Sequence, residues 1–250
     1  MSEEEMEGVL RIAMWSGPRN ISTAMMRSFE NRPDACVTDE PFYACYLART
    51  GVDHPMRHAV IESQPQDFAA VAASLQGPPP DPAARIWYQK HMCQHMLAED
   101  PLDWAEGLAN GFLIRDPRAV VASFAKNRGT PAAFELGFER QRQIFDHLRR
   151  ATGATPPVLD AEDVLGDPGR ALRALCDALG APFDPAMLAW PAGRRDSDGV
   201  WAPVWYKAVE ASTGFGAASP APETLPDELE RIAAAARPAY DAMAAHRLLG

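Results

Sequence analysis

The sequence predicts an α/β protein in which a parallel sheet is flanked by helices on both faces. Short apolar runs long enough for buried strands recur along the chain and begin near Leu10, Ala35, Arg85, Gly111 and Pro157. Segments with helical spacing of apolar residues follow most of these runs, and this alternation is typical of βα units that share one parallel sheet. We expect one domain over residues 1–250.

The first unit contains a loop suited to an anion. The apolar run 10–15 indicates a buried strand, which Ser16, Gly17 and Pro18 end. From residue 21 to 29 apolar residues recur at helical spacing, with Asn20 or Ser22 available to cap the helix. Such a turn directs backbone N–H groups and the positive end of a helix dipole at one place, most often a phosphate.

This loop lacks the lysine of a Walker A motif. In registers that start at Ser16 or Gly17, the lysine position holds Ser22 or Thr23. What remains is a Pro-Arg pair followed by two hydroxyl residues, in the order Pro18, Arg19, Asn20, Ile21, Ser22 and Thr23. Taken alone, this segment is compatible with a phosphate loop and with a plain helix start that carries an exposed arginine.

The second strand, 35–38, leads to Asp39 and Glu40, and a helix follows through Leu47. Open α/β sheets bind ligands at the carboxyl ends of their strands, so Glu40 is well placed for chemistry beside the loop. An alternative role for Asp39 is to cap a helix that begins at Pro41. Residues 51–84 form a polar insertion with a short helix over 65–75, and it has no recognisable chemistry.

A third strand, 85–89, precedes two histidines. His91 and His95 share one face if this segment is helical. A third metal ligand and an HExxH pattern are missing, so we expect no metal and place one of the two histidines in the wall of the substrate site. Ordinary helix histidines remain the alternative.

The fourth strand, 111–114, runs directly into Arg115, and a helix is expected from about Pro117 to Phe124. Arg115 and Ser123 are eight residues apart, which is about two helical turns. An arginine at a strand end with a serine eight residues later resembles the 3′-phosphate site of sulfotransferases. The alternative for Arg115 is a salt bridge to Asp116 or Glu40.

The rest of the chain adds a long amphipathic helix (132–150), a fifth strand (157–159), a helix ending at Gly180 (169–179) and a last helix (223–246). Between the last two helices, residues 193–216 collect cations and aromatic rings, among them Arg194 and Trp201. Aromatic faces stack on bases and cations meet phosphates. A hydrophobic lid held to the core by its tryptophans is the alternative.

Composition limits the partners. The net charge of −10 and pI near 5.1 argue against a general nucleic-acid binder, which needs a basic face. The four cysteines are scattered without a CxxC pair, so neither a zinc site nor a disulfide framework is expected. The acidic start is unlike a signal peptide, and no apolar run reaches membrane length. We expect a cytoplasmic protein without membrane or nucleic-acid partners.

These motifs resemble those of sulfotransferases. The Pro-Arg loop resembles their 5′-phosphosulfate loop, P-[KR]-[ST]-G-T-T, with Ile21 in the place of the glycine. The run FLIRDPRAVVASF resembles their 3′-phosphate site, and a branch of the family has PR-x-x-ST loops followed by DEP, here residues 39–41. The resemblance covers roughly residues 10–50, 85–125 and 156–190, and it implies a sheet of the P-loop type.

The resemblance implies transfer of a sulfuryl group from 3′-phosphoadenosine 5′-phosphosulfate, the co-substrate, to a hydroxyl or amine of a small-molecule acceptor, without a metal. Arg19 and the loop would bind the leaving phosphate, Arg115 and Ser123 the 3′-phosphate, and Arg194 and Trp201 would close over the nucleotide. Glu40 would be the general base, with His91 as the fallback. One alternative is a small-molecule kinase or another P-loop nucleotide transferase, which would need the lysine that this loop lacks. A second alternative is a catalytically inactive nucleotide-binding protein, because Ile21 stands at the glycine position.

Overall fold

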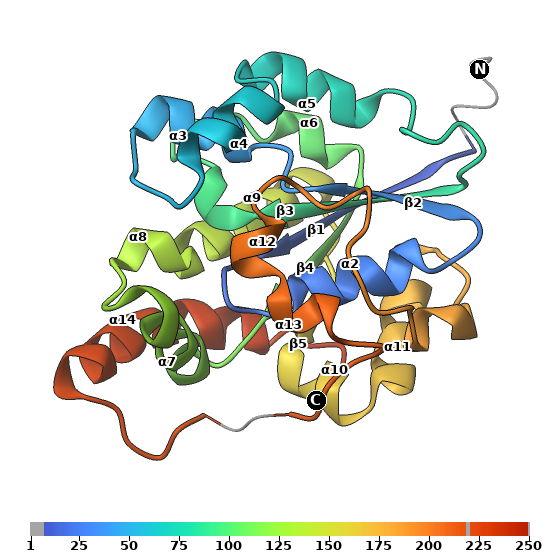
Figure 1. Ribbon diagram of the computed structural model, residues 1–250. Coiled ribbons are helices and arrows are strands. Elements are labelled where there is room, and N and C mark those ends of the chain that lie inside the picture. Colours follow the sequence, from blue (N-terminus) through green and yellow to red (C-terminus); the bar gives the residue numbers. More distant parts are fainter. Residues whose placement is uncertain (1–7, 219–220, 250) are drawn as a thin grey trace.

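A computed structural model describes residues 8–218 and 221–249 (Figure 1). Its centre is a sheet of five strands in the order β2-β3-β1-β4-β5, and every pairing is parallel. The strands are β1 (Leu10–Ser16), β2 (Ala35–Asp39), β3 (Ile86–Met92), β4 (Ala109–Ile114) and β5 (Val158–Asp160). The predicted parallel sheet is therefore confirmed.

Helices cover both faces of the sheet, as predicted. Figure 1 shows α5 (Phe68–Gln76) and α6 (Asp103–Glu106) above the sheet, with α2 (Ser22–Glu30) and α11 (Pro168–Leu179) below it. Side chains alternate along β1, so Trp15 joins the core under α5, α6, α9 (Phe138–Thr152) and α14 (Asp227–Ala244). Met14 joins the opposite core under α2 and α11. Burial on both faces explains why β1 and β4 are largely apolar runs.

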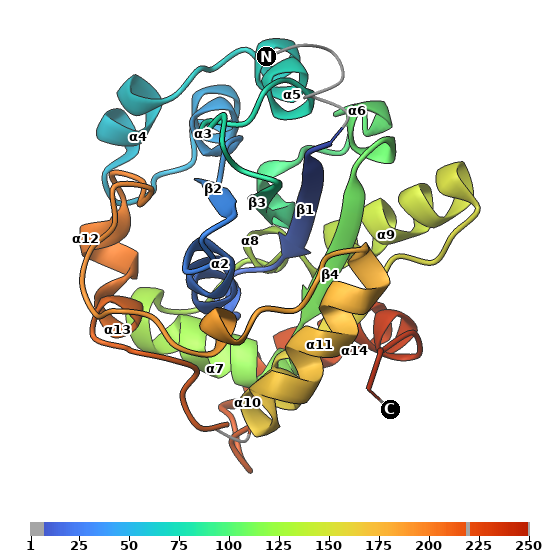
Figure 2. The same cartoon turned by 90° about the vertical axis from the view of Figure 1, so that its right-hand side faces the viewer.

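The topology creates a crevice at one edge of the sheet. All five carboxyl ends lie at the same edge because the strands are parallel. The connection from β1 to β2 contains α2 and crosses one face of the sheet. The connection from β3 to β4 contains α6 and passes over β1 on the opposite face (Figure 2). Ligands bind at such a switch point in open α/β sheets. The loop after β1 and the segment after β4 leave neighbouring strands there.

Two predicted elements differ from the structure. The helix expected over 132–150 is two helices, α8 (Ala133–Leu136) and α9, because Gly137 between them has φ +69°. A Cβ at Gly137 would also lie 3.2 Å from the backbone N of Gln94. The third strand extends to Met92, so Lys90 and His91 belong to a strand and point to opposite faces. His91 and His95 therefore do not share a helix face.

The other elements are mostly short. They are α3 (Tyr43–Thr50), α4 (Arg57–Ser63), η1 (Cys93–His95), α7 (Pro117–Arg128), α10 (Ala161–Gly166), η2 (Pro185–Leu188), α12 (Ala202–Trp205) and α13 (Lys207–Glu210). The insertion 51–84 thus holds α4 as well as the expected α5, and the segment 193–216 contains α12 and α13. Among the helices of residues 8–218 and 221–249, none is both long and apolar enough to cross a membrane.

Candidate active site

The loop between β1 and α2 has a backbone that its side chains permit. Gly17 is needed because a Cβ there would lie 2.8 Å from the carbonyl O of Leu136. Ile21 has φ −88°, an ordinary value, and its side chain packs against the core on the α2 side of the sheet. An isoleucine at this position therefore requires no glycine-like conformation. The left-handed residue of the loop is Arg19, at φ +56°.

Neither predicted capping residue caps α2. The N-cap is Ile21, without a side-chain hydrogen bond to the helix. Asn20 instead links the loop to β4, because its Nδ2 donates to the carbonyl O of Leu113 at 3.0 Å. The first amides of α2 thus receive no side-chain cap, and the first N–H groups of a helix have no partner within it.

The loop forms one wall of a pocket of about 450 Å³. All six residues from Pro18 to Thr23 line it, including Asn20, Ile21 and Ser22. Glu40, Arg115 and Ser123 line the same pocket, although they come from the ends of other strands and from α7. The structure thus brings together the loop, the strand-end carboxylate and the second arginine that the sequence singled out.

Two arginines in this pocket lie close together, and neither is paired with a carboxylate of residues 8–218 or 221–249. Arg19 Nε donates to Ser123 Oγ at 3.0 Å, and Arg115 Nη1 donates to the carbonyl O of Arg19 at 2.8 Å. Within the described residues, no carboxylate oxygen lies within 4.0 Å of either guanidinium, and Asp116 pairs with Arg237 instead. Burial lowers the pKa of Arg19, and Arg115 lowers it further. Two half-buried cations with hydrogen-bond donors to spare favour an anionic ligand.

Glu40 reaches the pocket through a buried ion pair with Lys90. Lys90 Nζ lies 2.7 Å from Glu40 Oε1 and 2.9 Å from Asp39 Oδ1. Burial alone lowers the pKa of Lys90, but Asp39 and Glu40 together raise it well above its usual value, so the lysine is charged. Burial raises the pKa of Glu40, which Lys90 opposes. Asp39 serves this ion pair and not the capping role, since α3 begins only at Tyr43.

The structure places the two histidines in different surroundings. His91 is 1% exposed, stacks on Trp15 with ring centroids 4.6 Å apart, and does not line the pocket. His95 does line it, between the rings of Tyr43 and Tyr46. Its Nδ1 lies 3.9 Å from Glu40 Oε2, beyond hydrogen-bond distance, and burial holds its pKa well below the usual value. His95 is therefore neutral at physiological pH.

The segment 193–216 reaches the pocket with its second half. Arg194 is exposed and lies outside the pocket lining, and Trp201 is buried with its Nε1 donating to Tyr206 Oη at 3.0 Å. Trp205 and Tyr206 line the pocket in their place. Trp201 thus anchors the segment to the core, which is the lid arrangement weighed as the alternative for these residues.

Sequence reasoning missed Lys90 and Tyr206. Lys90 has a detectable signal, because it continues the strand pattern of residues 86–89 into the edge where ligands bind. Tyr206 carries no comparable signal, since its partners Lys90 and Asp39 are more than 100 residues away. The sequence had only marked its segment as rich in aromatic residues.

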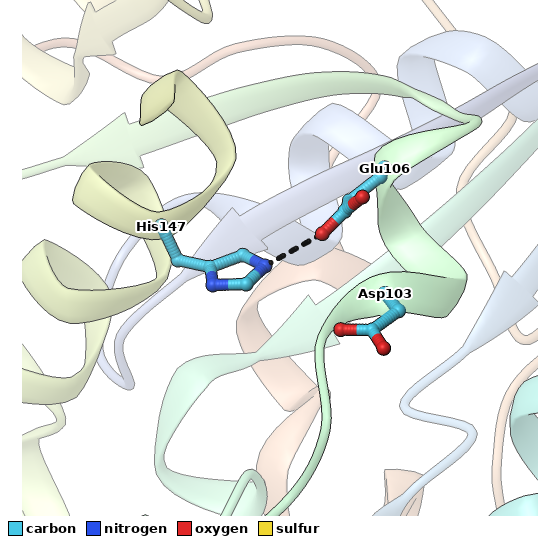
Figure 3. Close-up of side chains that lie close together, drawn as sticks. All are labelled: Asp103, Glu106 and His147. Atoms are coloured by element: carbon cyan, nitrogen blue, oxygen red, sulfur yellow. Dashed lines mark hydrogen bonds and ion pairs between the residues drawn. The ribbon is translucent and has the colours of Figure 1, made fainter. Parts of the chain in front are cut away.

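One cluster of possible metal ligands lies outside the pocket. Figure 3 shows His147 of α9 pointing toward Glu106 of α6, with Asp103 beside them. His147 Nε2 and Glu106 Oε1 are 2.9 Å apart. This contact links α9 to α6 as an ordinary histidine–carboxylate hydrogen bond.

The fold and the pocket define a parallel α/β protein in which two half-buried arginines line a pocket at the carboxyl edge of the sheet. Residues 10–247 match the family described as "Sulfotransferase domain", and the chain belongs to this family. In structure, the chain resembles a sulfotransferase domain from the curacin biosynthetic pathway (TM-score 0.54, 18% identity, 91% of this chain and 97% of that one). It also resembles a sulfotransferase from Alicyclobacillus acidocaldarius (TM-score 0.57, 12% identity, 95% and 96%).

Curated relatives are nearer in sequence. Branched-chain-amino-acid aminotransferase-like protein 1 of Arabidopsis thaliana is 37% identical over 240 residues, which are 94% of this chain and 42% of that protein. Protein 2 of the same name and organism is 37% identical over 216 residues, covering 86% of this chain and 38% of that protein. The chain therefore spans about two fifths of the length of these relatives.

Proposed function

We propose that this protein transfers a sulfuryl group from 3′-phosphoadenosine 5′-phosphosulfate to a hydroxyl or amine of a small-molecule acceptor, without a metal. The observation that carries the proposal is the meeting of Arg19, Arg115 and Ser123 in one pocket at the N-terminus of α2. Two guanidinium groups without a carboxylate partner favour a ligand with more than one anionic group. A nucleotide with phosphates at both 3′ and 5′ positions has this character.

The roles follow from where each group lies. The amides that begin α2 and the Arg19 guanidinium would hold the 5′-phosphate, and Arg115 with Ser123 the 3′-phosphate. Glu40 would stand on the acceptor side, because His95, Tyr43 and Tyr46 extend the pocket wall beyond it. Lys90 would not contact the nucleotide, since its three N–H donors already have acceptors.

The proposed reaction is an in-line displacement at sulfur. The acceptor oxygen or nitrogen forms a bond to sulfur while the bond from sulfur to the bridging phosphate oxygen breaks. Glu40 takes the acceptor's proton, and adenosine 3′,5′-bisphosphate leaves with the bonding electrons. Negative charge grows on the leaving phosphate, where Arg19 and the helix amides stabilise it. Catalysis then depends on positioning and on charge stabilisation.

The first test concerns the 3′-phosphate. Arg115→Ala should weaken binding of adenosine 3′,5′-bisphosphate by about 1.5–3 kcal/mol, or roughly 10- to 150-fold, because a charge-assisted hydrogen bond is lost. AMP lacks the 3′-phosphate, so its affinity should change little. Titration calorimetry with both nucleotides measures the difference.

The matched control is Arg150→Ala, an exposed arginine of α9 that should leave both affinities unchanged. Equal losses for AMP and the bisphosphate in Arg115→Ala would contradict the 3′-phosphate assignment. The class of donor is tested on the unaltered protein by thermal shift, where the bisphosphate should stabilise it and ATP with Mg²⁺ should not. Stabilisation by ATP alone would favour a kinase.

The second test concerns Arg19. Arg19→Lys keeps a charge at this left-handed position, and Arg19→Ala removes it. Arg19→Ala should lower kcat roughly 10²–10³-fold, because charge on the leaving phosphate is larger in the transition state than in the bound donor. Bisphosphate affinity should fall less than kcat does. A change confined to the donor KM would mean that Arg19 only binds the ground state.

A further inference from the structure

A buried polar network joins residues 199–206 to Glu40. Its centre is Lys90, whose ammonium group has three N–H donors. Nζ donates to Asp39 Oδ1 at 2.9 Å and to Glu40 Oε1 at 2.7 Å. The third acceptor is Tyr206 Oη, also at 2.7 Å. All four side chains are buried, and Lys90 is 1% exposed, so this lysine is fully occupied within the protein.

Tyr206 connects this network to the segment that covers the pocket. Its hydroxyl donates to Asp39 Oδ2 at 2.6 Å and accepts from Trp201 Nε1 at 3.0 Å as well as from Lys90. One donor and two acceptor positions are all that a hydroxyl offers. The backbone N of Gly199 donates to the same Asp39 oxygen at 3.3 Å. Asp39 and Lys90 therefore hold Glu40 on one side and residues 199–206 on the other.

We infer that Tyr206 is a positioning residue that sets the orientation and basicity of Glu40 through Lys90 and Asp39. The inference rests on the proposed function, in which Glu40 takes the acceptor's proton. It adds that the segment 199–206 supports catalysis beyond its contribution to the pocket wall, although Trp201 is buried away from the pocket. Displacing this segment would leave the phosphate site in place but would change the orientation and the basicity of Glu40.

The charges around Glu40 explain how a neutral hydroxyl has this effect. The groups that face Glu40 are one cation, Lys90, a second carboxylate, Asp39, and the neutral side chains of His95, Tyr43 and Tyr206. Burial raises the pKa of Glu40, Lys90 lowers it, Asp39 raises it, and the Tyr206 hydroxyl lowers it. The Tyr206 hydroxyl donates to Asp39 and so shares that carboxylate's negative charge with Lys90. Without the hydroxyl, Asp39 draws Lys90 more strongly, and Lys90 stabilises the Glu40 anion less.

The experiment is the pH profile of kcat/KM between pH 5 and 9 for two variants with opposite expected signs. The rate of the unaltered enzyme should fall as pH drops through the pKa of Glu40, at a higher pH than for an ordinary glutamate. Tyr206→Phe should move this acid limb upward by about 0.5–1 pH unit, the equivalent of one hydrogen bond. Asp39→Asn removes the neighbouring negative charge and should move the limb downward.

Tyr240→Phe is the matched control, because its hydroxyl also donates to a carboxylate, Asp160 Oδ2, at 2.6 Å and lies outside the pocket. Its acid limb should stay in place. A Tyr206→Phe enzyme that is slower with an unmoved limb would show that the hydroxyl only holds the segment in place and does not act on Glu40, which overturns the inference. If Tyr206→Phe does not fold, Asp39→Asn is the test. A downward shift of its acid limb supports the inference, and an upward shift or none overturns it. If Glu40→Gln keeps the full rate, the proposed base itself is wrong, whatever the limbs do.

Discussion

Glu40→Gln should retain nucleotide binding and lose roughly 10²–10⁴ in kcat, the contribution of a positioned general base. The amide keeps the shape of the side chain, and its oxygen can still accept from Lys90 at the position of Oε1, 2.7 Å away in the native protein. It cannot take a proton at neutral pH. Steady-state kinetics with saturating donor and calorimetry with adenosine 3′,5′-bisphosphate separate the two effects.

A glutamate outside the pocket provides the comparison. Glu106 of α6 accepts a hydrogen bond from His147 and does not line the pocket, so Glu106→Gln should leave kcat within a few-fold of the native value. A Glu40→Gln variant that loses bisphosphate affinity and turnover in the same proportion would show that the glutamate shapes the pocket and does not act as a base.

The sequence was sufficient for the sheet because local signals and global fold agree there. β1 and β4 are buried along most of their length, so each is a largely apolar run that can be recognised without knowledge of its neighbours. The loop after β1 and the segment after β4 were recognisable for the same reason, since each combines a strand end with a helix start. The contact between Arg19 and Ser123 could not be predicted from such local signals, because it depends on the pairing of β4 with β1.

The arrangement around Glu40 depends on register and could not be predicted from local pattern. Asp39 and Lys90 are direct partners in the pairing of β2 with β3, and only this register makes their side chains neighbours. The sequence showed that Glu40 follows a strand and that Lys90 follows an apolar run, but not that the strands are adjacent. Tyr206 then joins from a segment without periodicity, where neither strand nor helix rules apply.

The resemblance to sulfotransferases, some of which use a histidine as the base, also made His91 the fallback base. The strand continues through Met92, which turns His91 into the core beside Trp15 and Trp104. The pKa of this histidine falls to about 3 through burial, so it is neutral in the folded protein. His95, four residues on, lines the pocket instead.

Lys90→Met should have the largest effect on stability of any single change at the site. Among the described residues, Lys90 is the only cation within 4.0 Å of the Asp39 and Glu40 carboxylates, because His95, which is 3.9 Å from Glu40, is neutral. Removing one member of a buried ion pair costs about 3–5 kcal/mol, because the remaining charge is left unpaired in a buried site. Urea unfolding at pH 7.5 should show a loss of this size in the free energy of unfolding.

The loss should depend on pH with a definite sign. Lys90 lowers the pKa of Glu40, so its removal raises the folded-state pKa of that carboxyl further above the unfolded value of about 4.3. A carboxyl with a raised folded-state pKa stabilises the fold fully below the unfolded pKa, and this contribution is lost as pH rises through the folded pKa. The difference in the free energy of unfolding between the variant and the native protein should therefore be smallest near pH 4 and largest at neutral pH.

The control is Lys207→Met, which makes the same substitution at an exposed site one residue after Tyr206. Its cost in the free energy of unfolding should stay within about 0.5 kcal/mol at every pH. A Lys90→Met cost equal to that of Lys207→Met, or one that does not change between pH 4 and 7.5, would mean that the two carboxylates are not held as a buried charged group.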